Sequence, residues 1–250
     1  MSTVVLHQFA ISHFCEKVRW ALALKGVEHR LLCHLPGAHA RTARRLTGRS
    51  SLPVLELGPA NAIGGSSAIL DRLDTVFPEP RLTPAEPRLA EAARRWETYL
   101  DGTLGPAVRR VCYDTLLDHP YTCKALLAQG TPWYGKPLLG LMWPKLAPTM
   151  RKGFGLTAAG VARAREDIER ALDALDRARD VDGYLVGGRF TRADLTAAAL
   201  LAPLTREPGY GLRWPARLPD PVGALSETLA PRLAWVSATY AAHRPPRPPR

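Results

Sequence analysis

The stretch VVLHQFAISHFC, residues 4–15, contains the turn that decides the fold. Its apolar run from Val4 to Phe9 is short and continuous, as in a strand that is covered on both faces. A helical pattern begins at Glu16. A strand that turns directly into a helix directs free N–H groups and the positive helix end at one point, where a deprotonated hydroxyl or thiol is favoured. Ser12 and Cys15 are therefore the first candidates for catalytic residues.

Length and cysteine content predict a protein with its own apolar core and without disulfides or a structural metal. The 250 residues, 46% of them hydrophobic, are enough to bury a core. The four cysteines form no Cys-x-x-Cys pair and show no zinc-finger spacing, so we expect neither a dithiol nor a metal site. Nothing like a signal peptide precedes Val4, and no apolar run approaches the roughly 20 residues that a membrane span requires. We therefore expect a cytoplasmic protein with no membrane span.

The net charge of +11 at pH 7 raises the question of an anionic partner, such as a nucleic acid or a membrane surface. The charge comes from 28 arginines and 6 lysines, which are dispersed along the chain rather than grouped beside aromatic residues. Together with the abundant alanine and proline, this composition is typical of a protein from a GC-rich genome. We therefore expect no nucleic-acid partner, although a basic surface could attract anionic substrates.

The first part of the chain predicts an α/β unit. A helix over residues 14–25 leads from the first strand to a second apolar segment, residues 30–35, which can pair parallel to the first strand because the helical crossover returns the chain in the same direction. The basic segment that follows, residues 36–49, is expected to be a surface helix with its arginines in solvent.

A hairpin and a further helix are expected next. The strand that begins at Leu52-Pro53 has its proline at the start, where a strand tolerates it, and a turn joins it to Ala62-Ile63. The helix after this hairpin can be capped by Ser66 or Ser67, and its start presents unpaired N–H groups that suit an anion.

The rest of the chain predicts a second domain that consists of helices. Four prolines between residues 78 and 87 interrupt any helix and mark a linker. Apolar residues then recur at helical spacing, except over residues 105–155, where prolines cut the pattern and no helix is assigned. Thr191 and Asp194 can form a capping box, which is a structural role. The expected divisions are residues 1–78 for the α/β domain, 79–86 for the linker, 87–242 for the helical domain and 243–250 for a disordered, basic, proline-rich tail.

Four short motifs, each weak alone, occur in an order and at intervals that resemble the soluble glutathione S-transferase superfamily over nearly the whole chain. They are Ser12-x-x-Cys15, Leu52-Pro53, Gly65-Ser66-Ser67-Ala68-Ile69 and Thr191-x-x-Asp194. The resemblance implies that family's fold, a thioredoxin-like α/β N-terminal domain packed on an all-α helical-bundle C-terminal domain. It also implies a homodimer.

The resemblance assigns roles to five residues. Ser12 matches the activating residue of the bacterial serine- and cysteine-type members, which hydrogen-bonds the glutathione sulfur and favours the thiolate, as an oxyanion hole would. Pro53 matches a proline with a cis peptide bond, which leaves the backbone of Leu52 free to pair with the tripeptide. Ser66 matches the serine that holds the γ-glutamyl carboxylate at a helix start, and Ser67 is its neighbour in that task.

Three further residues complete the candidate thiol-binding set. Gly65 stands where the family usually has Glu, Gln or Asp in contact with the γ-glutamyl amine, a charge-assisted contact worth about 1.5 to 3 kcal/mol. The co-substrate is therefore either glutathione or another low-molecular-weight thiol. His13 replaces a common proline and is either a contact of the ligand or a surface imidazole. Phe14 follows it at the same turn.

The resemblance implies an enzyme that activates this thiol for conjugation to, or isomerisation of, a small hydrophobic electrophile. Trp96, Tyr99 and Tyr113 are either the lining of an acceptor pocket or part of the core. Two alternatives remain. One is a binding or scaffold protein that keeps the fold without catalysis, and the other is a thiol transferase that depends on Cys15, a residue type that is more often a small buried side chain.

Overall fold

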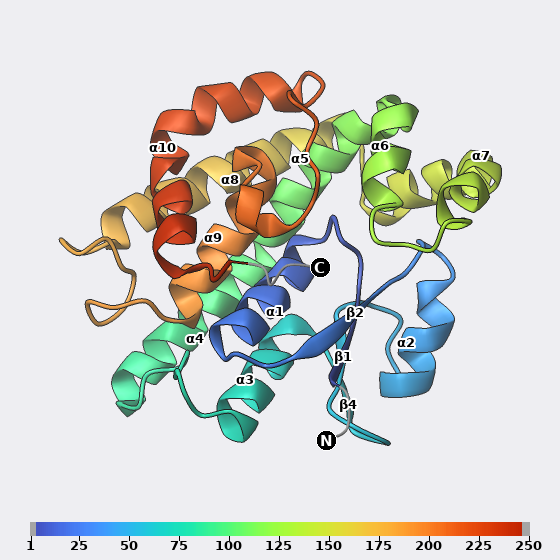
Figure 1. Cartoon of the computed structure of the whole chain (residues 1–250). Coiled ribbons are helices and arrows are strands. Elements are labelled where there is room, and N and C mark those ends of the chain that lie inside the picture. The colour runs from blue at the N-terminus through green and yellow to red at the C-terminus, as the bar shows by residue number, and fades with distance from the viewer. Residues whose placement is uncertain (1–3, 247–250) are drawn as a thin grey trace.

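The computed structural model describes residues 4–246, and the first part of the chain forms a four-stranded sheet with α1 and α3 on one side and α2 on the other (Figure 1). Its elements are β1 (Val4–Gln8), α1 (His13–Leu24), β2 (His29–Cys33), α2 (His39–Thr47), β3 (Val54–Glu56), β4 (Ala62–Gly64) and α3 (Ser66–Val76). This order agrees with the α/β unit that the sequence predicts, and α2 is the expected surface helix, with Arg41, Arg44 and Arg45 exposed.

The sheet has the strand order β2-β1-β3-β4. β1 pairs with β2 in parallel, with Leu6 opposite Leu31, and with β3 in antiparallel, with Leu6 opposite Leu55. β3 and β4 form the expected antiparallel hairpin. The parallel pair follows from the helical crossover through α1, which the sequence predicts.

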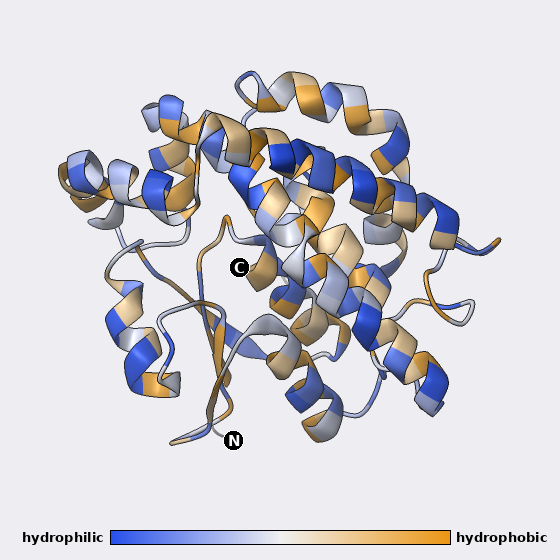
Figure 2. Cartoon of the chain, turned by 180° about the vertical axis from the view of Figure 1, so that it is seen from behind, coloured by the Kyte–Doolittle hydropathy of each residue, from blue (hydrophilic) through white to orange (hydrophobic). Residues whose placement is uncertain are grey.

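The second part of the chain consists of helices. They are α4 (Pro87–Gly102), α5 (Leu104–Asp118), α6 (Pro120–Leu127), α7 (Gly135–Gly153), α8 (Ala158–Ala178), α9 (Arg192–Thr205), the 3-10 helix η1 (Pro208–Tyr210) and α10 (Val222–His243). Along α8, apolar residues at helical spacing are buried and charged residues lie in solvent, and such amphipathic helices are visible in Figure 2. In the described part of the chain, no helix is both long and apolar enough to cross a bilayer.

Residues 105–155, which sequence patterns do not resolve, form α5, α6 and α7. Three of the prolines in this stretch stand in first turns, where the backbone needs no N–H donor: Pro106 in α5, Pro120 in α6 and Pro137 in α7. Pro144 and Pro148 lie inside α7. If every proline is taken as a helix break, these helices are missed, because three of the six prolines mark helix starts and two are tolerated inside α7.

Helix α9 is buried along nearly its whole length and packs against α1, α4 and α10. The predicted capping box begins it. The Thr191 N–H donates to the Asp194 carboxylate at 2.8 Å, and the Thr191 hydroxyl accepts from the start of the helix. The carboxylate also accepts from the Leu185 N–H at 2.8 Å, so it is fully engaged in structure, as predicted.

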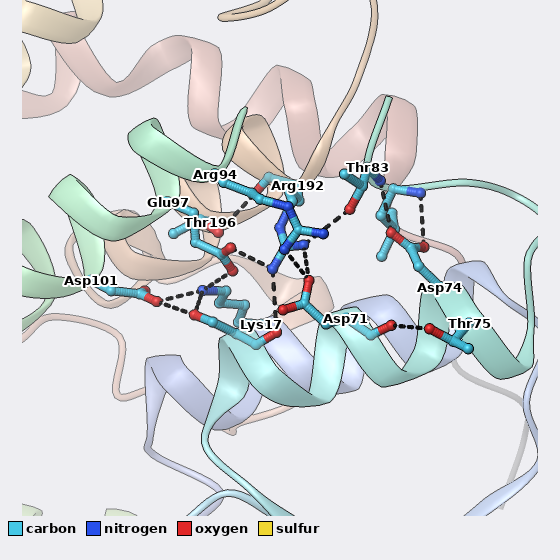
Figure 3. A network of polar contacts seen from close by, with 12 residues as sticks. Lys17, Asp71, Asp74, Thr75, Thr83, Arg94, Glu97, Asp101, Arg192 and Thr196 are labelled. Atoms are coloured by element: carbon cyan, nitrogen blue, oxygen red, sulfur yellow. Dashed lines mark hydrogen bonds and ion pairs between the residues drawn. The ribbon is translucent and has the colours of Figure 1, made fainter. Parts of the chain in front are cut away.

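A buried network of charges, which sequence patterns do not predict, joins α1 and α3 to α4 and α9 (Figure 3). Glu97 of α4 pairs with Lys17 of α1 at 2.6 Å and with Arg192 of α9 at 2.5 Å. Arg192 also reaches Asp71 of α3, and Lys17 reaches Asp101 of α4 at 2.7 Å. Since the Lys17, Glu97 and Arg192 side chains are at most 4% exposed, each of these charges depends on the others.

His243 and Arg244, which are predicted from the sequence to lie in a disordered tail, are held against α1. The expected disordered tail begins at His243, but α10 continues through His243, whose carbonyl accepts from the Trp20 indole N–H at 2.9 Å. The Arg244 guanidinium pairs with Glu16 of α1 at 2.9 Å, and both side chains are buried. The start of the predicted tail is therefore wrong because a buried carboxylate holds Arg244 in place; residues 247–250 of that tail lie outside the described part of the chain.

Candidate functional site

A cavity of about 460 Å³ lies between the start of α1 and the helices α5 and α7. On the side of the sheet it is lined by Ser12, His13, Phe14 and Leu52, four of the candidate site residues. The opposite wall is aromatic and apolar apart from Arg109, and includes Tyr113, Leu116, Met150 and Phe154. Phe14 therefore stands beside the candidate donor Ser12, on the wall that faces the helices.

Ser12 is the N-cap of α1. Its hydroxyl oxygen accepts from the Cys15 N–H at 3.3 Å, and its own backbone is extended. This contact uses one acceptor lone pair of the hydroxyl and leaves its O–H proton, which can be donated to the neighbouring Cys15 thiol or to a ligand in the cavity. A cap and a thiolate donor are thus compatible roles for this residue. An anion at this point would also be favoured by the positive end of α1.

Cys15 lies one turn into α1 and is completely buried. Burial raises the pKa of its thiol, and the opposing effects of Ser12 and the nearby Arg19 are smaller. A helix start alone would lower that pKa, but removal from water dominates here. Cys15 is also absent from the cavity lining. Its environment is that of a packing residue, not of a thiolate nucleophile.

His13 lies in the cavity wall and is only 5% exposed, so the expectation of a surface imidazole is wrong. The reason is tertiary: α5 covers the start of α1, and the ring meets Gly105 and Phe14. Burial, helped by the charge of Arg109, lowers the pKa of His13 to about 3. Its Nε2 has no hydrogen-bond partner among the described residues, which leaves a neutral polar atom beside Ser12.

We expect His13→Gln to make the fold less sensitive to acid. Below pH 6.5 the unfolded chain protonates this histidine, whereas the folded protein does so only near its pKa of about 3. The stability that neutral His13 contributes is therefore complete above pH 6.5 and is lost progressively as the pH falls. From pH 7.5 to pH 5 this loss is about 2 kcal/mol. Urea unfolding at both pH values should show that His13→Gln loses about 2 kcal/mol less than the wild type; equal losses would contradict the buried, neutral state.

The Leu52–Pro53 peptide bond is cis, as the resemblance implies. The Pro53 carbonyl accepts from the Gly65 N–H at 3.0 Å, so this peptide bond and the start of α3 are adjacent. The expected serine cap of α3 is absent, because Gly65 is the N-cap residue and Ser66 is already the first helical residue. The Ser67 hydroxyl donates to the Asp101 carboxylate at 2.6 Å and accepts from the Lys17 ammonium group at 3.3 Å, so it is part of the buried network.

The aromatic lining of the cavity differs from the predicted set. Tyr113 lines the cavity, but Trp96 and Tyr99 belong to a separate shallow depression on α4. Sequence reasoning also missed Arg109 and Phe154 as lining residues. A signal for Arg109 exists, since residues 109, 112, 113 and 116 follow helical spacing and put one arginine in an otherwise apolar and aromatic stripe.

A sheet of this order, with a cis-proline before β3 and followed only by helices, defines a thioredoxin-like domain joined to an all-helical domain. A family model described as the glutathione S-transferase N-terminal domain matches residues 6–81, and one described as the glutathione S-transferase C-terminal domain matches residues 158–220. The chain belongs to the glutathione S-transferase superfamily.

Solved structures agree with this family. A glutathione S-transferase from Methylobacterium radiotolerans, in complex with glutathione sulfonate, is 26% identical with a TM-score of 0.61, over 100% of this chain and 98% of that chain. The β-etherase LigF from a Sphingobium species is 20% identical with a TM-score of 0.68, over 96% of this chain and 95% of that chain. A glutathione S-transferase from Methylobacillus flagellatus with glutathione bound is 19% identical with a TM-score of 0.60, over 95% of this chain and 94% of that chain. No curated protein shows significant sequence similarity to this chain.

Proposed function

We propose that this protein is a thiol-dependent transferase or isomerase, in which Ser12 activates glutathione or an analogous low-molecular-weight thiol for attack on a small hydrophobic electrophile. The observation that carries the proposal is the position of the Ser12 hydroxyl: it caps α1 and lines a cavity whose other wall is aromatic and apolar. Glutathione bound to one of the similar structures, and glutathione sulfonate bound to another, support the choice of thiol.

The chemistry that this arrangement can support needs few catalytic groups. The thiol loses its proton to solvent, and the Ser12 O–H donates to the thiolate while the positive end of α1 lowers the energy of its charge. The thiolate sulfur then forms a bond to the electrophilic carbon. In conjugation a leaving group departs or a proton is added, and in isomerisation the thiol leaves again. The cavity walls hold both reactants close together.

The roles proposed for the sheet residues follow from their positions. Leu52 presents its backbone to the thiol from the wall that carries Ser12, and Ser66 offers the first N–H groups of α3 to a carboxylate. Ser67 contributes through the buried network that fixes α3, since its hydroxyl is occupied. The family resemblance further predicts a homodimer, which light scattering of the purified protein can test.

Thermal unfolding with a panel of thiols tests the proposal. A ligand at one hundred times its dissociation constant stabilises the folded state by about 2.7 kcal/mol, which corresponds to a rise of about 5 to 10 °C for a protein of this size. We expect such a rise with millimolar glutathione or another cellular thiol, but not with an equimolar mixture of glycine and glutamate. Absence of a rise with every thiol, together with absence of thiol-dependent turnover, would contradict the proposal and favour a binding protein without catalysis.

Gly65→Glu should have two opposite effects if glutathione is the thiol. Gly65 has a φ of +94°, and a Cβ placed there would meet no atom within 4 Å. The substitution therefore costs about 1 to 3 kcal/mol of backbone strain without a clash, and it adds a carboxylate for the γ-glutamyl amine. We expect a lower melting temperature without ligand and a larger gain with glutathione. Gly48→Glu, at a φ of +74° with equally open space directly after α2, is the control and should show only the loss.

A further inference from the structure

Arg109 occupies an unusual environment on α5. It lines the cavity near His13, and its guanidinium carbon lies 5.0 Å from the centre of the Phe154 ring. Within residues 4–246 the Arg109 side chain forms neither an ion pair nor a hydrogen bond. The more deeply buried arginines differ in this respect, since Arg19 pairs with Glu16 and Arg192 pairs with Glu97. Among the described residues, Arg109 is thus a half-buried guanidinium with no carboxylate and no hydrogen bond, whereas its neighbour Arg110, also without a carboxylate, donates to the Phe154 carbonyl at 3.0 Å.

The cavity itself offers no charge to balance Arg109. No aspartate, glutamate or lysine is among the described residues that line it. Two histidines lie in the wall, and burial lowers the pKa of both His13 and His39, so both are neutral at pH 7. Burial also lowers the pKa of Arg109, but a guanidinium stays protonated in proteins. Among the described lining residues, Arg109 is therefore the one with a permanent charge.

The neighbours of Arg109 indicate what kind of molecule brings the missing anion. Tyr113 stands one turn further along α5, and its ring lies 4.8 Å from that of Phe154, so Phe154 contacts both side chains. Leu116 continues the same face of α5 into the cavity. A planar, apolar body fits against these rings, and the fork of five guanidinium donors fits a carboxylate.

We infer that Arg109 binds a carboxylate on the electrophilic substrate, so that the acceptor is an aromatic or similarly apolar acid rather than a neutral hydrophobic compound. This inference rests on the proposed function, because it assigns the electrophile to the helical wall. The residues proposed for the thiol, Ser12, Leu52 and Ser66, all come from the α/β half. Arg109 lies on the opposite wall, where the electrophile must sit to face a thiolate at Ser12.

Calorimetric binding of a matched pair of compounds to the whole protein, without thiol, tests the inference. The pair is 4-chloro-3-nitrobenzoate and 4-chloro-3-nitrobenzamide, which differ in charge but hardly in shape. We expect the wild type to bind the benzoate at least about tenfold more tightly, the ratio for a charge-assisted contact. Arg109→Gln should abolish this preference and leave the affinity for the benzamide within about twofold, because only the charged contact is lost. Arg109→Lys should keep part of the preference.

Arg95→Gln is the matched control, since it removes the same charge from the exposed surface of α4, where Arg95 pairs with Glu91. This variant should bind both compounds like the wild type. Arg109→Gln should also melt close to the wild type, since the cation that it removes has no carboxylate partner and loses only its contact with the Phe154 ring. Equal binding of the two compounds by the wild type, no measurable binding of the benzoate, or a preference that survives in Arg109→Gln would each overturn the inference.

One further measurement shows whether Arg109 binds the carboxylate of the electrophile or that of the thiol. A second one distinguishes failure of this inference from failure of the proposed function. If Arg109→Gln lost its thermal stabilisation by thiol while keeping its preference for the benzoate, Arg109 would bind the thiol's own carboxylate and the inference would be overturned. Turnover of the benzoate with the stabilising thiol is measured separately. A preference for the benzoate without any turnover would contradict the proposed thiol chemistry but would support recognition of an anion at Arg109.

Discussion

Ser12→Ala is expected to lower thiol-dependent turnover by about 10²- to 10³-fold, the usual effect of removing one donor to a developing negative charge. Cys15→Ala should retain turnover, because Cys15 is fully buried and its thiol pKa is raised. The measurement is the initial rate of conjugation of 1-chloro-2,4-dinitrobenzene, or of the chloronitrobenzoate above, with the thiol that stabilises the protein. Loss of turnover in Cys15→Ala with retention in Ser12→Ala would reverse the assignment and indicate a cysteine-dependent thiol transferase.

The Ser12 experiment needs a control for the helix cap, because the alanine also removes the contact with the Cys15 N–H, worth about 1 kcal/mol. Thr157 provides it: its hydroxyl caps α8 in the same way, accepting from the Gly160 N–H at 3.1 Å, and Thr157 does not line the cavity. Thr157→Ala should lose similar stability and keep full turnover. Ser12→Cys, which keeps a donor at the same place, should recover part of the activity.

Glu97→Gln is expected to lower the free energy of unfolding by about 3 to 5 kcal/mol, the usual cost of removing one partner from a buried ion pair. The glutamine keeps the shape of the side chain, but it leaves Lys17 and Arg192 with one carboxylate each, Asp101 and Asp71. The side chains of Lys17, Glu97 and Arg192 are all buried, so solvent cannot replace the lost charge. Urea unfolding monitored by circular dichroism measures this loss, and the transition midpoint should fall clearly.

Glu91→Gln is the matched control, since Glu91 lies on the same helix and pairs with Arg95 at 2.9 Å, but both side chains are about two-thirds exposed or more. Such a surface pair contributes at most about 1 kcal/mol, so this variant should unfold almost like the wild type. A similar small change in Glu97→Gln would mean that the network shown in Figure 3 does not hold α4 and α9 to the α/β half.

Much of the secondary structure was predictable because it depends on patterns of residues that are close together in the sequence. The short apolar run before Ser12, the helical spacing after it and the proline at the start of β3 each act over a few residues, and the observed elements agree with them. The family followed from four short motifs at the right intervals, and both domain models confirm it. Where prolines mark helix starts rather than breaks, as in α5 to α7, local patterns misled.

The candidate site was predictable only in part. Of the nine candidate residues selected from the sequence, four line the cavity: Ser12, His13, Phe14 and Leu52. The other five do not: Cys15, Pro53, Gly65, Ser66 and Ser67. Sequence reasoning did not find the opposite wall, because the residues there come from a different stretch of the chain and contribute single side chains. Arg109 has a local signal, one charge in an apolar stripe, but the sequence does not show that the stripe faces Ser12.

By itself, the sequence determined the order of the elements, the family and the residue that offers a hydroxyl at the start of α1. The tertiary structure alone decided which groups are charged and available: it buries Cys15 and His13 and so changes their pKa values, ties Arg244 to Glu16, and leaves Arg109 without a carboxylate in the cavity. The physical reason is that desolvation and pairing of charges depend on neighbours that are distant in the sequence, whereas helix and strand patterns depend on near ones.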